Sequence, residues 1–298
     1  MNRYQKQSMN TDFIKDAARR LGLTCTGIAS AHLPVPETEQ PVCPLASGKG
    51  MERYDLTSLL PDCKAAVVIL FPYYNRETEK TNLSLYCQLE DYHLIVPAYL
   101  EKLSAILTSY GGTQRCIADT SPLTERLLAV EAGLGFVGDN QCLIHPVYGS
   151  YCFIGAILTT LPLTPDAPMD RECLHCGACQ RICPGGCLSE GTYDYHLCKS
   201  YLTQKKEPLT DREMEVIART PLIFGCDECQ RVCPHNKGVP ITPIVEFRQN
   251  RLTMLRKEDI ESLTNRQFRT TYGNRPFSWR GKKILLRNLD IVHAKTGL

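Results

Sequence analysis

Seven cysteines occur in two similar runs whose spacing is typical of iron–sulfur proteins. The first run, ECLHCGACQRICPGG at residues 172–186, has the pattern C-x2-C-x2-C-x3-C followed by proline. In such a run three thiolates bind one [4Fe–4S] cluster, and the fourth, next to the proline, binds a second cluster. The run therefore predicts a partner run. GCDECQRVCPHN at 225–236 provides one, with the pattern C-x2-C-x3-C-P.

An eighth thiol completes two ligand sets. Cys198, in YHLCKSYL, lies between the two runs, and Cys187 in CPGGC could replace a neighbouring ligand. Structural zinc is the alternative, because paired C-x2-C motifs also bind zinc, but C-x3-C-P is rare in zinc sites. The favoured interpretation is two [4Fe–4S] clusters. Their expected ligands are Cys173, Cys176, Cys179 and Cys233 for one cluster and Cys183, Cys198, Cys226 and Cys229 for the other.

Length and composition exclude several other classes of protein. The 298 residues include 16 cysteines, but disulfide frameworks belong mostly to secreted chains shorter than about 100 residues. The first residues are charged and helix-like without an apolar signal region, and no stretch approaches the roughly 18 apolar residues that span a bilayer. These features predict a cytoplasmic protein with no membrane association.

Hydrophobic periodicity predicts a mixed α and β region ahead of the cysteine runs. Helical spacing occurs at 10–22, 91–109 and 123–133, and short apolar runs typical of strands occur at 25–29, 63–74, 115–119 and 150–163. The proline-rich segment LPLTPDAP at 161–168 marks a boundary. We expect an N-terminal α/β (α+β) domain at 1–165, a ferredoxin-like domain at 166–238 and a basic helical segment at 239–298 that packs back on the core. The last segment includes one amphipathic helix at 278–295.

The glycine motif GLGFVG at 133–138 resembles a dinucleotide-binding fingerprint but lacks its context. That fingerprint requires a strand before the glycines and a helix after them, so that a phosphate meets the helix N-terminus. Here a predicted helix precedes the motif and turn-forming residues follow it. The glycines instead suggest close backbone approach to something large and flat, with Asn140 and the YGS turn at 148–150 lining the gap.

Positive charge is concentrated at the C-terminal end. Residues 237–298 contain 13 Lys/Arg and 5 Asp/Glu, about +8, so the rest of the chain carries about −6 of the net +2. Such a surface suits an anionic partner such as nucleic acid, although a solvated helix face is equally consistent. Aromatic side chains lie among these arginines and either stack on bases or pack the tail onto the protein: Phe268, Tyr272, Phe277 and Trp279.

Most of the chain resembles the epoxyqueuosine reductases. The resemblance is carried by the stretch from ADTSPLTER at 118–126 to LTTLPL at 158–163, by both cysteine runs with CKSYLT, by EDYH at 90–93 and by RPFSWRGKKILLRN at 275–288. It implies a cobalamin-binding domain related to reductive dehalogenases, joined to a ferredoxin-like domain with two [4Fe–4S] clusters. It also implies reduction of epoxyqueuosine to queuosine at the wobble position of tRNA.

The resemblance assigns roles to further residues. Asp119 falls where the family has its candidate general acid, a role that requires a raised pKa through burial beside the corrin; an Asp before Thr-Ser-Pro is also an ordinary helix N-cap. The expected cobalamin contacts are His93, Gly133, Gly135, Phe136, Asn140, Tyr148, Gly149 and Ser150. His93 could ligate cobalt or simply hydrogen-bond a core carbonyl. The expected partners are a tRNA anticodon stem-loop and an external electron donor such as a flavodoxin or ferredoxin, and we expect a monomer.

The chain departs from the family pattern at two points, and two other functions are weighed separately. Asp139 stands where the family often has lysine, and the chain is expected to be a short form without a C-terminal helical-repeat extension. One alternative is a corrinoid and iron–sulfur reductase acting on a small molecule, for example by reductive dehalogenation. The other is a non-catalytic ferredoxin-like electron-transfer subunit.

Overall fold

The long apolar run at 63–74 forms a central strand, β2 (Ala65–Pro72), all of whose residues are buried. β2 lies in a four-stranded sheet of order β1-β2-β6-β3, with β1 (Thr26–Ser30), β6 (Cys152–Thr159) and β3 (Gln114–Ile117). Every pairing is antiparallel, with Thr26 opposite Ile69 and Ala65 opposite Thr159. The computed structural model describes residues 11–36, 42–46, 48–76, 80–189 and 192–296.

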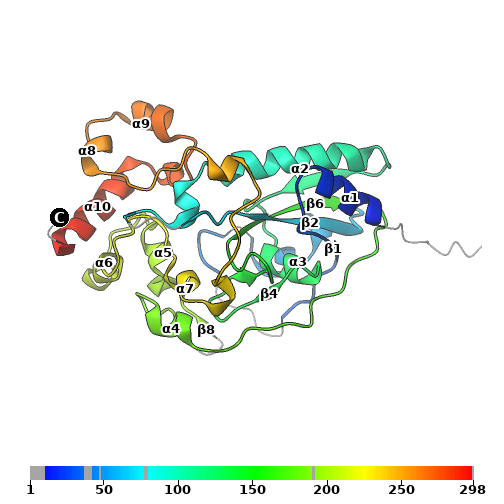
Figure 1. Ribbon diagram of the computed structural model, residues 1–298, viewed down its shortest axis with the longest axis horizontal. Helices are drawn as coiled ribbons and strands as arrows, with labels where there is room; N and C mark the ends of the chain where they lie inside the picture. The colour runs from blue at the N-terminus through cyan, green and yellow to red at the C-terminus, as the bar shows by residue number, and fades with distance from the viewer. Residues whose placement is uncertain (1–10, 37–41, 47, 77–79, 190–191, 297–298) are drawn as a thin grey trace, which may run out of the picture. The chain divides into compact units, whose positions relative to one another are not determined.

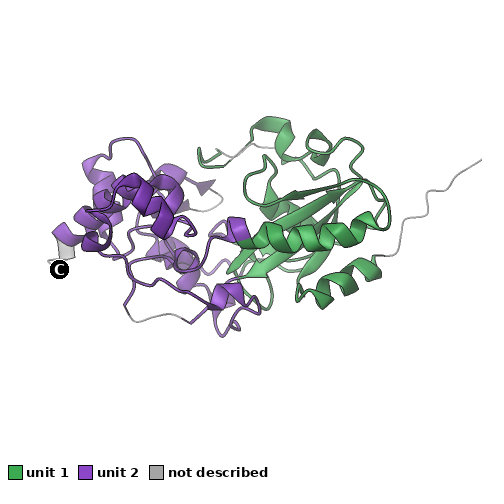
Figure 2. Cartoon of the chain, turned by 90° about the horizontal axis from the view of Figure 1, so that it is seen from above, with its two compact units in different colours: residues 1–72, 95–138, 142–173 green, residues 73–94, 139–141, 174–298 purple. Residues whose placement is uncertain are grey.

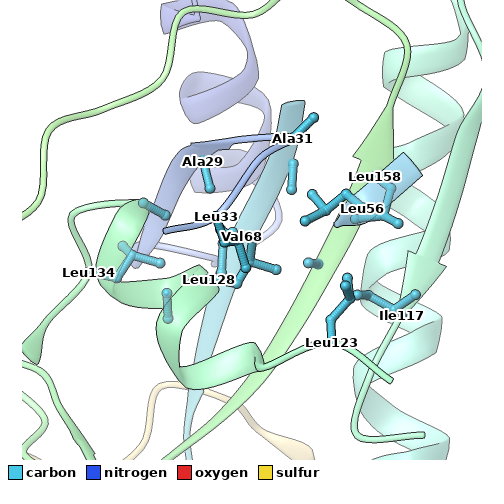
Figure 3. Packing of buried hydrophobic residues seen from close by; sticks show 14 of the residues in the cluster. Ala29, Ala31, Leu33, Leu56, Val68, Ile117, Leu123, Leu128, Leu134 and Leu158 are labelled. Carbon is cyan, nitrogen blue, oxygen red and sulfur yellow. The ribbon is translucent and has the colours of Figure 1, made fainter. Parts of the chain in front are cut away.

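Helices cover both faces of this sheet (Figure 1). α1 (Asp12–Arg20) and α2 (Tyr92–Thr108) lie on one face, and α3 (Glu125–Glu131) lies on the other. A Cβ atom added at Gly155 in β6 would lie 2.8 Å from the side chain of Val96, so α2 approaches the sheet closely there. On the opposite face Leu128 belongs to the same buried hydrophobic cluster as Val68 and Leu158 (Figure 3). Cover on both faces explains why β2 is apolar throughout rather than alternating.

Two short strands follow α3 and form a hairpin: β4 (Phe136–Val137) pairs with β5 (Leu143–Ile144). The motif at 133–138 therefore connects a helix to a strand. Because a dinucleotide fingerprint connects a strand to a helix, its rejection from sequence is confirmed.

The chain divides into two compact units that interleave along the sequence (Figure 2). The first comprises residues 1–72, 95–138 and 142–173, and the second comprises 73–94, 139–141 and 174–298. The elements of the second unit are α4 (Ala178–Ile182), β7 (Leu188–Ser189), β8 (Thr192–Tyr193), α5 (Lys199–Leu202), α6 (Asp211–Ala218), α7 (Glu228–Arg231), α8 (Lys257–Ile260), α9 (Asn265–Tyr272) and α10 (Lys282–Thr296). The three-part division expected from the sequence stays a prediction.

The second unit has its own aromatic core. Phe224, Phe268 and Phe277 are almost fully buried, together with Leu285 and Leu289 of α10. The helix expected at 278–295 is shorter than predicted, since Gly281 has φ +77° and separates a 3-10 turn (Ser278–Arg280) from α10. Glycine adopts this left-handed conformation without steric cost, so the helix restarts at Lys282.

The architecture is a mixed α and β fold, and the expected class is confirmed in its α+β form, because the main sheet is antiparallel. None of the helices within the described ranges is both long enough and apolar enough to cross a bilayer.

Candidate functional site

Asp119 lies on the segment that connects β3 to α3. It is exposed, two residues beyond the end of β3, and its backbone has φ +59°. Its N–H donates a hydrogen bond to Oε1 of Glu125 at 2.7 Å, which holds the segment against the first turn of α3. The N-cap of α3 is Thr124. The alternative interpretation of Asp119 as an ordinary helix N-cap is therefore wrong.

A small pocket lies beside the Asp119 segment. Its volume is about 220 Å³, and its lining includes Arg115 and Cys116 of β3, Leu100 of α2, and Thr120 and Ser121. Pockets that enclose drug-sized ligands have volumes of roughly 300–1,000 Å³. This pocket is therefore too small to enclose a corrin ring, although it leaves space next to the segment that carries Asp119.

His93 lies in the first turn of α2 and is oriented by a carboxylate. Its Nδ1 lies 2.8 Å from Oδ1 of Asp91, and its backbone N–H donates to the same oxygen at 3.0 Å. The imidazole also stacks on Tyr92, with ring centroids 4.1 Å apart. Because the carboxylate engages Nδ1, a metal ligated by His93 would have to bind Nε2, the arrangement common for metal-binding histidines. The geometry fits the predicted role, which stays a prediction.

At two of the motif glycines, neighbouring backbone segments of this chain leave no space for a side chain. A Cβ atom at Gly133 would lie 2.6 Å from the carbonyl oxygen of Ala167, and one at Gly135 would lie 2.4 Å from that of Ile144. Phe136 is buried in β4. The close backbone approach inferred from sequence is therefore present, but it involves other segments of this chain. Contacts of these residues with cobalamin stay predictions.

The other expected cobalamin contacts differ in exposure. Asn140 and Ser150 are buried, and Tyr148 is half-buried. Gly149 has φ +58° and closes a tight turn with His145, in which each N–H donates to the other's carbonyl oxygen. Val137 of β4 and Val147 at the tip of this turn are exposed.

The two cysteine runs adopt the same local structure. Each forms a one-turn helix, α4 or α7, and the two helices contact each other. Each helix is followed by a cysteine in extended conformation before a proline, with ψ 118° at Cys183 and ψ 124° at Cys233. A residue before proline is restricted to this conformation, so the C-P step directs the thiol out of the helix.

Cys183 and Cys198 are surrounded by donors suited to thiolates. Cys183 accepts hydrogen bonds from the Cys187 thiol and from backbone N–H groups of residues 185–187, which lower its pKa to about 5. Cys198 accepts from the Cys187 thiol and from N–H groups in the first turn of α5, which lower its pKa to about 6. Burial raises the pKa of Cys226 to about 12. Metal ligation requires thiolates and favours such N–H donors. The surroundings of Cys183 and Cys198 therefore suit ligand thiolates, whereas burial alone disfavours a thiolate at Cys226.

Asp139, the departure from the family pattern, has a partner in the structure. Its Oδ1 lies 2.9 Å from Nδ1 of His175, which lies next to Cys176. The carboxylate is thus oriented by a histidine of the first cysteine run.

Comparisons with known proteins agree with this geometry. The family model of the 4Fe-4S double cluster binding domain matches residues 172–236, and that of epoxyqueuosine reductase QueG, DUF1730, matches residues 53–120. An epoxyqueuosine reductase of Bacillus cereus is 32% identical over 307 residues, which cover 93% of this chain and 79% of the relative. The chain belongs to the epoxyqueuosine reductase family. The Bacillus subtilis enzyme is 34% identical over 253 residues, covering 80% of this chain and 65% of the relative.

Solved structures of the same family share the fold. An epoxyqueuosine reductase bound to an epoxyqueuosine-modified tRNA-Tyr stem loop matches 96% of this chain and 81% of its own, with TM-score 0.87 and 26% identity. The Streptococcus thermophilus enzyme matches the same shares with TM-score 0.83 and 27% identity. The Bacillus subtilis enzyme, solved with a catalytic aspartate loop swung out of the active site, also has TM-score 0.83 and 27% identity over these shares.

The comparisons confirm two predictions: an oxidoreductase and a pair of [4Fe–4S] clusters. Sequence reasoning missed Glu125, which holds the Asp119 segment. The sequence indicated this role only by placing Glu125, an acidic residue, in the first turn of the helix that follows Asp119.

Proposed function

We propose that this chain reduces epoxyqueuosine to queuosine at the wobble position of tRNA. The observation that carries the proposal is its likeness, over 96% of its length, to an epoxyqueuosine reductase solved with an epoxyqueuosine-modified stem loop. A small-molecule reductase and an electron-transfer subunit are the rival functions. Neither rival function requires likeness to an epoxyqueuosine reductase throughout both compact units.

In this proposal eight cysteines hold the clusters. Cys183, Cys198, Cys226 and Cys229 bind one [4Fe–4S] cluster, and the hydrogen-bonded environments of Cys183 and Cys198 support that assignment. Cys173, Cys176, Cys179 and Cys233 bind the other. His93 and residues 133–150 are the proposed cobalamin contacts, and the exposed Val137 and Val147 offer apolar surface for the ring. Cobalamin, when bound, supplies a reduced metal centre to the epoxide carbon.

Reduction of the epoxide consumes two electrons and two protons. The carbon–oxygen bonds break, a carbon–carbon double bond forms, and the oxygen leaves as water. An oxygen that leaves in this way needs a proton donor within hydrogen-bond reach. We assign that role to Asp119. Its carboxyl is carried on an exposed segment, and the Glu125 hydrogen bond fixes the backbone of that segment.

The tail offers one aromatic group for the tRNA. Phe268 and Phe277 are buried and Tyr272 packs against them, whereas Trp279 is 56% exposed. The guanidinium of Arg280 lies 3.7 Å from the centre of the Trp279 ring. An exposed indole beside an arginine suits stacking on an unpaired base near a phosphate. We therefore propose that Trp279 and Arg280 contact the RNA.

Other tail arginines contribute to the fold. Arg287 donates to the carbonyl oxygen of Lys205, and Arg275 donates to that of Gln88. The net charge of the tail thus overstates the charge available to RNA. We further propose that the protein is a cytoplasmic monomer that receives electrons from a flavodoxin or ferredoxin.

The test is a single-turnover assay on anaerobically reconstituted protein with cobalamin, a chemical reductant and an epoxyqueuosine-containing stem loop. Mass spectrometry of the digested nucleosides should show loss of one oxygen from the modified base, and omission of cobalamin should abolish it. Full cobalamin and iron content without conversion would favour the small-molecule reductase. Iron without retained cobalamin would favour the electron-transfer subunit.

A further inference from the structure

Cys187 is a buried thiol that contacts two proposed cluster ligands. Its side chain is 5% exposed, and its Sγ lies 3.3 Å from Sγ of Cys183. The thiol of Cys183 and, to a lesser extent, that of Cys198 raise the pKa of Cys187, so Cys198 is its second sulfur neighbour. Its backbone N–H donates to Sγ of Cys183 at 3.4 Å.

The backbone on both sides fixes this position. Gly186 has φ +64° and closes a turn in which its N–H donates to the carbonyl oxygen of Cys183. A Cβ atom at Gly185 would lie 1.6 Å from the carbonyl oxygen of Leu197, so this loop packs tightly on the segment that leads to Cys198. The β7–β8 hairpin begins directly after Cys187 and brings the chain back to Cys198. Cys187 is therefore held between the two ligands by tight packing.

Cys187 is not needed to complete either ligand set. A disulfide requires an S–S distance near 2.05 Å, so the 3.3 Å separation from Cys183 is that of a hydrogen bond. As a cluster ligand Cys183 is a thiolate with no proton to donate, so the Cys187 thiol acts as the donor.

We propose that Cys187 is a positioning residue whose S–H donates to the ligand sulfur of Cys183, beside that of Cys198, and raises the reduction potential of the cluster that both ligands hold. The inference rests on the cluster assignment made above. Hydrogen bonds to ligand sulfurs set cluster potentials, because they stabilise the more negative, reduced state. A thiol placed beside two ligands of one cluster and none of the proposed ligands of the other would adjust one potential selectively.

The test compares full-length, reconstituted wild type with Cys187→Ala and Cys187→Ser by iron analysis and by redox titration monitored by electron paramagnetic resonance. We expect about eight iron atoms per chain in all three proteins. In Cys187→Ala one midpoint potential should move to a more negative value while the other is unchanged. Cys187→Ser retains a donor and should recover part of the shift.

Cys63→Ala is the matched control. Cys63 is 6% exposed, and its thiol donates to the carbonyl oxygen of Ala65 in the first unit. Removal of the Cys63 thiol should leave the midpoint potentials of both clusters unchanged. Full iron content with unchanged potentials in Cys187→Ala would overturn the inference, and so would loss of about half the iron, which would make Cys187 a ligand. Wild type that binds fewer than about eight iron atoms would instead refute the ligand assignment itself, and failure to convert tRNA would affect only the proposed substrate.

Discussion

The backbone N–H of Asp119 donates to the carboxylate of Glu125 at 2.7 Å, across the turn that joins β3 to α3. This hydrogen bond fixes a residue in left-handed conformation, φ +59°, which is uncommon for residues other than glycine. A related enzyme has been solved with its catalytic aspartate loop swung out of the active site. We infer that Glu125 favours one position of the loop in this chain.

Glu125→Ala should therefore slow the reaction without abolishing it. Loss of the acceptor frees the Asp119 segment, and misplacement of a catalytic group by about 1 Å can cost up to about 100-fold in rate. We expect a decrease of about tenfold in the single-turnover rate with unchanged stem-loop affinity. Glu125→Gln keeps an acceptor oxygen and should stay close to wild type. Glu131→Ala, at the opposite end of α3, is the matched control, and an equal loss there would contradict the positioning role.

Asp119→Asn should abolish most of the activity while leaving binding intact. Asparagine has the same shape and tolerates φ +59°, so the loop should keep its conformation. Loss of a general acid typically costs about 10²–10⁴-fold in rate. Single-turnover conversion would be measured together with iron content and stem-loop affinity. Conversion at the wild-type rate would exclude Asp119 as the proton donor.

Trp279→Ala should weaken tRNA binding more than it affects the conversion of bound tRNA. Stacking of a base on an aromatic side chain contributes about 1–3 kcal/mol, so Kd should rise about 5- to 150-fold. Fluorescence anisotropy with a labelled stem loop would measure it. Tyr110→Ala removes another half-exposed aromatic side chain, in the first unit, and serves as control. Equal affinity of Trp279→Ala and wild type would place the RNA elsewhere.

Acid should destabilise the turn closed by His145. Nδ1 of His145 accepts the N–H groups of Val147 and Tyr148 at 3.1 and 3.3 Å, and burial lowers its pKa below the ordinary 6.5. Below pH 6.5 the imidazole of His145 binds a proton in the unfolded chain but not yet in the folded protein, where its pKa is lower. The free energy of unfolding should therefore fall as the pH falls from 6.5 toward the pKa of the folded protein. Thermal unfolding at about pH 7.5 and about pH 5.5 would measure the loss.

His145→Asn is the comparison for that measurement. The asparagine oxygen can accept the same N–H groups but does not titrate in this range. The variant should lose less stability than wild type between the two pH values. An identical loss in both proteins would assign the acid sensitivity to other groups.

Gly135→Ala should destabilise the protein even without cobalamin. A methyl group there would lie 2.4 Å from the carbonyl oxygen of Ile144, which is backbone and cannot move aside easily. Overpacking of this kind costs about 1–3 kcal/mol, which chemical denaturation of the cofactor-free protein would detect. Gly135 is not among the glycines with positive φ, so the loss would report the steric clash rather than backbone strain. If Gly135→Ala is as stable as wild type without the cofactor, packing does not require this glycine, and the proposed contact with cobalamin is its remaining role.

Features that depend on local pattern could be predicted before the structure was known. The spacing of the cysteines predicted two clusters, because ligand separation along the chain limits which thiols can surround one iron–sulfur core. The apolar run at 63–74 predicted β2, and helical spacing predicted α1, α2 and α3. The order of elements around residues 133–138 was enough to reject a dinucleotide site.

Contacts between groups far apart in the sequence could be identified only from the folded chain. Nothing local shows that the oxygens facing Gly133 and Gly135 belong to Ala167 and Ile144. The burial of Phe268 and Phe277, against the exposure of Trp279, likewise depends on the core that surrounds Phe224. The Asp119–Glu125 hydrogen bond depends on a left-handed residue that sequence pattern does not reveal. Hydrophobic periodicity reports which face of an element is buried, but the partner across that face is set by packing of the whole chain.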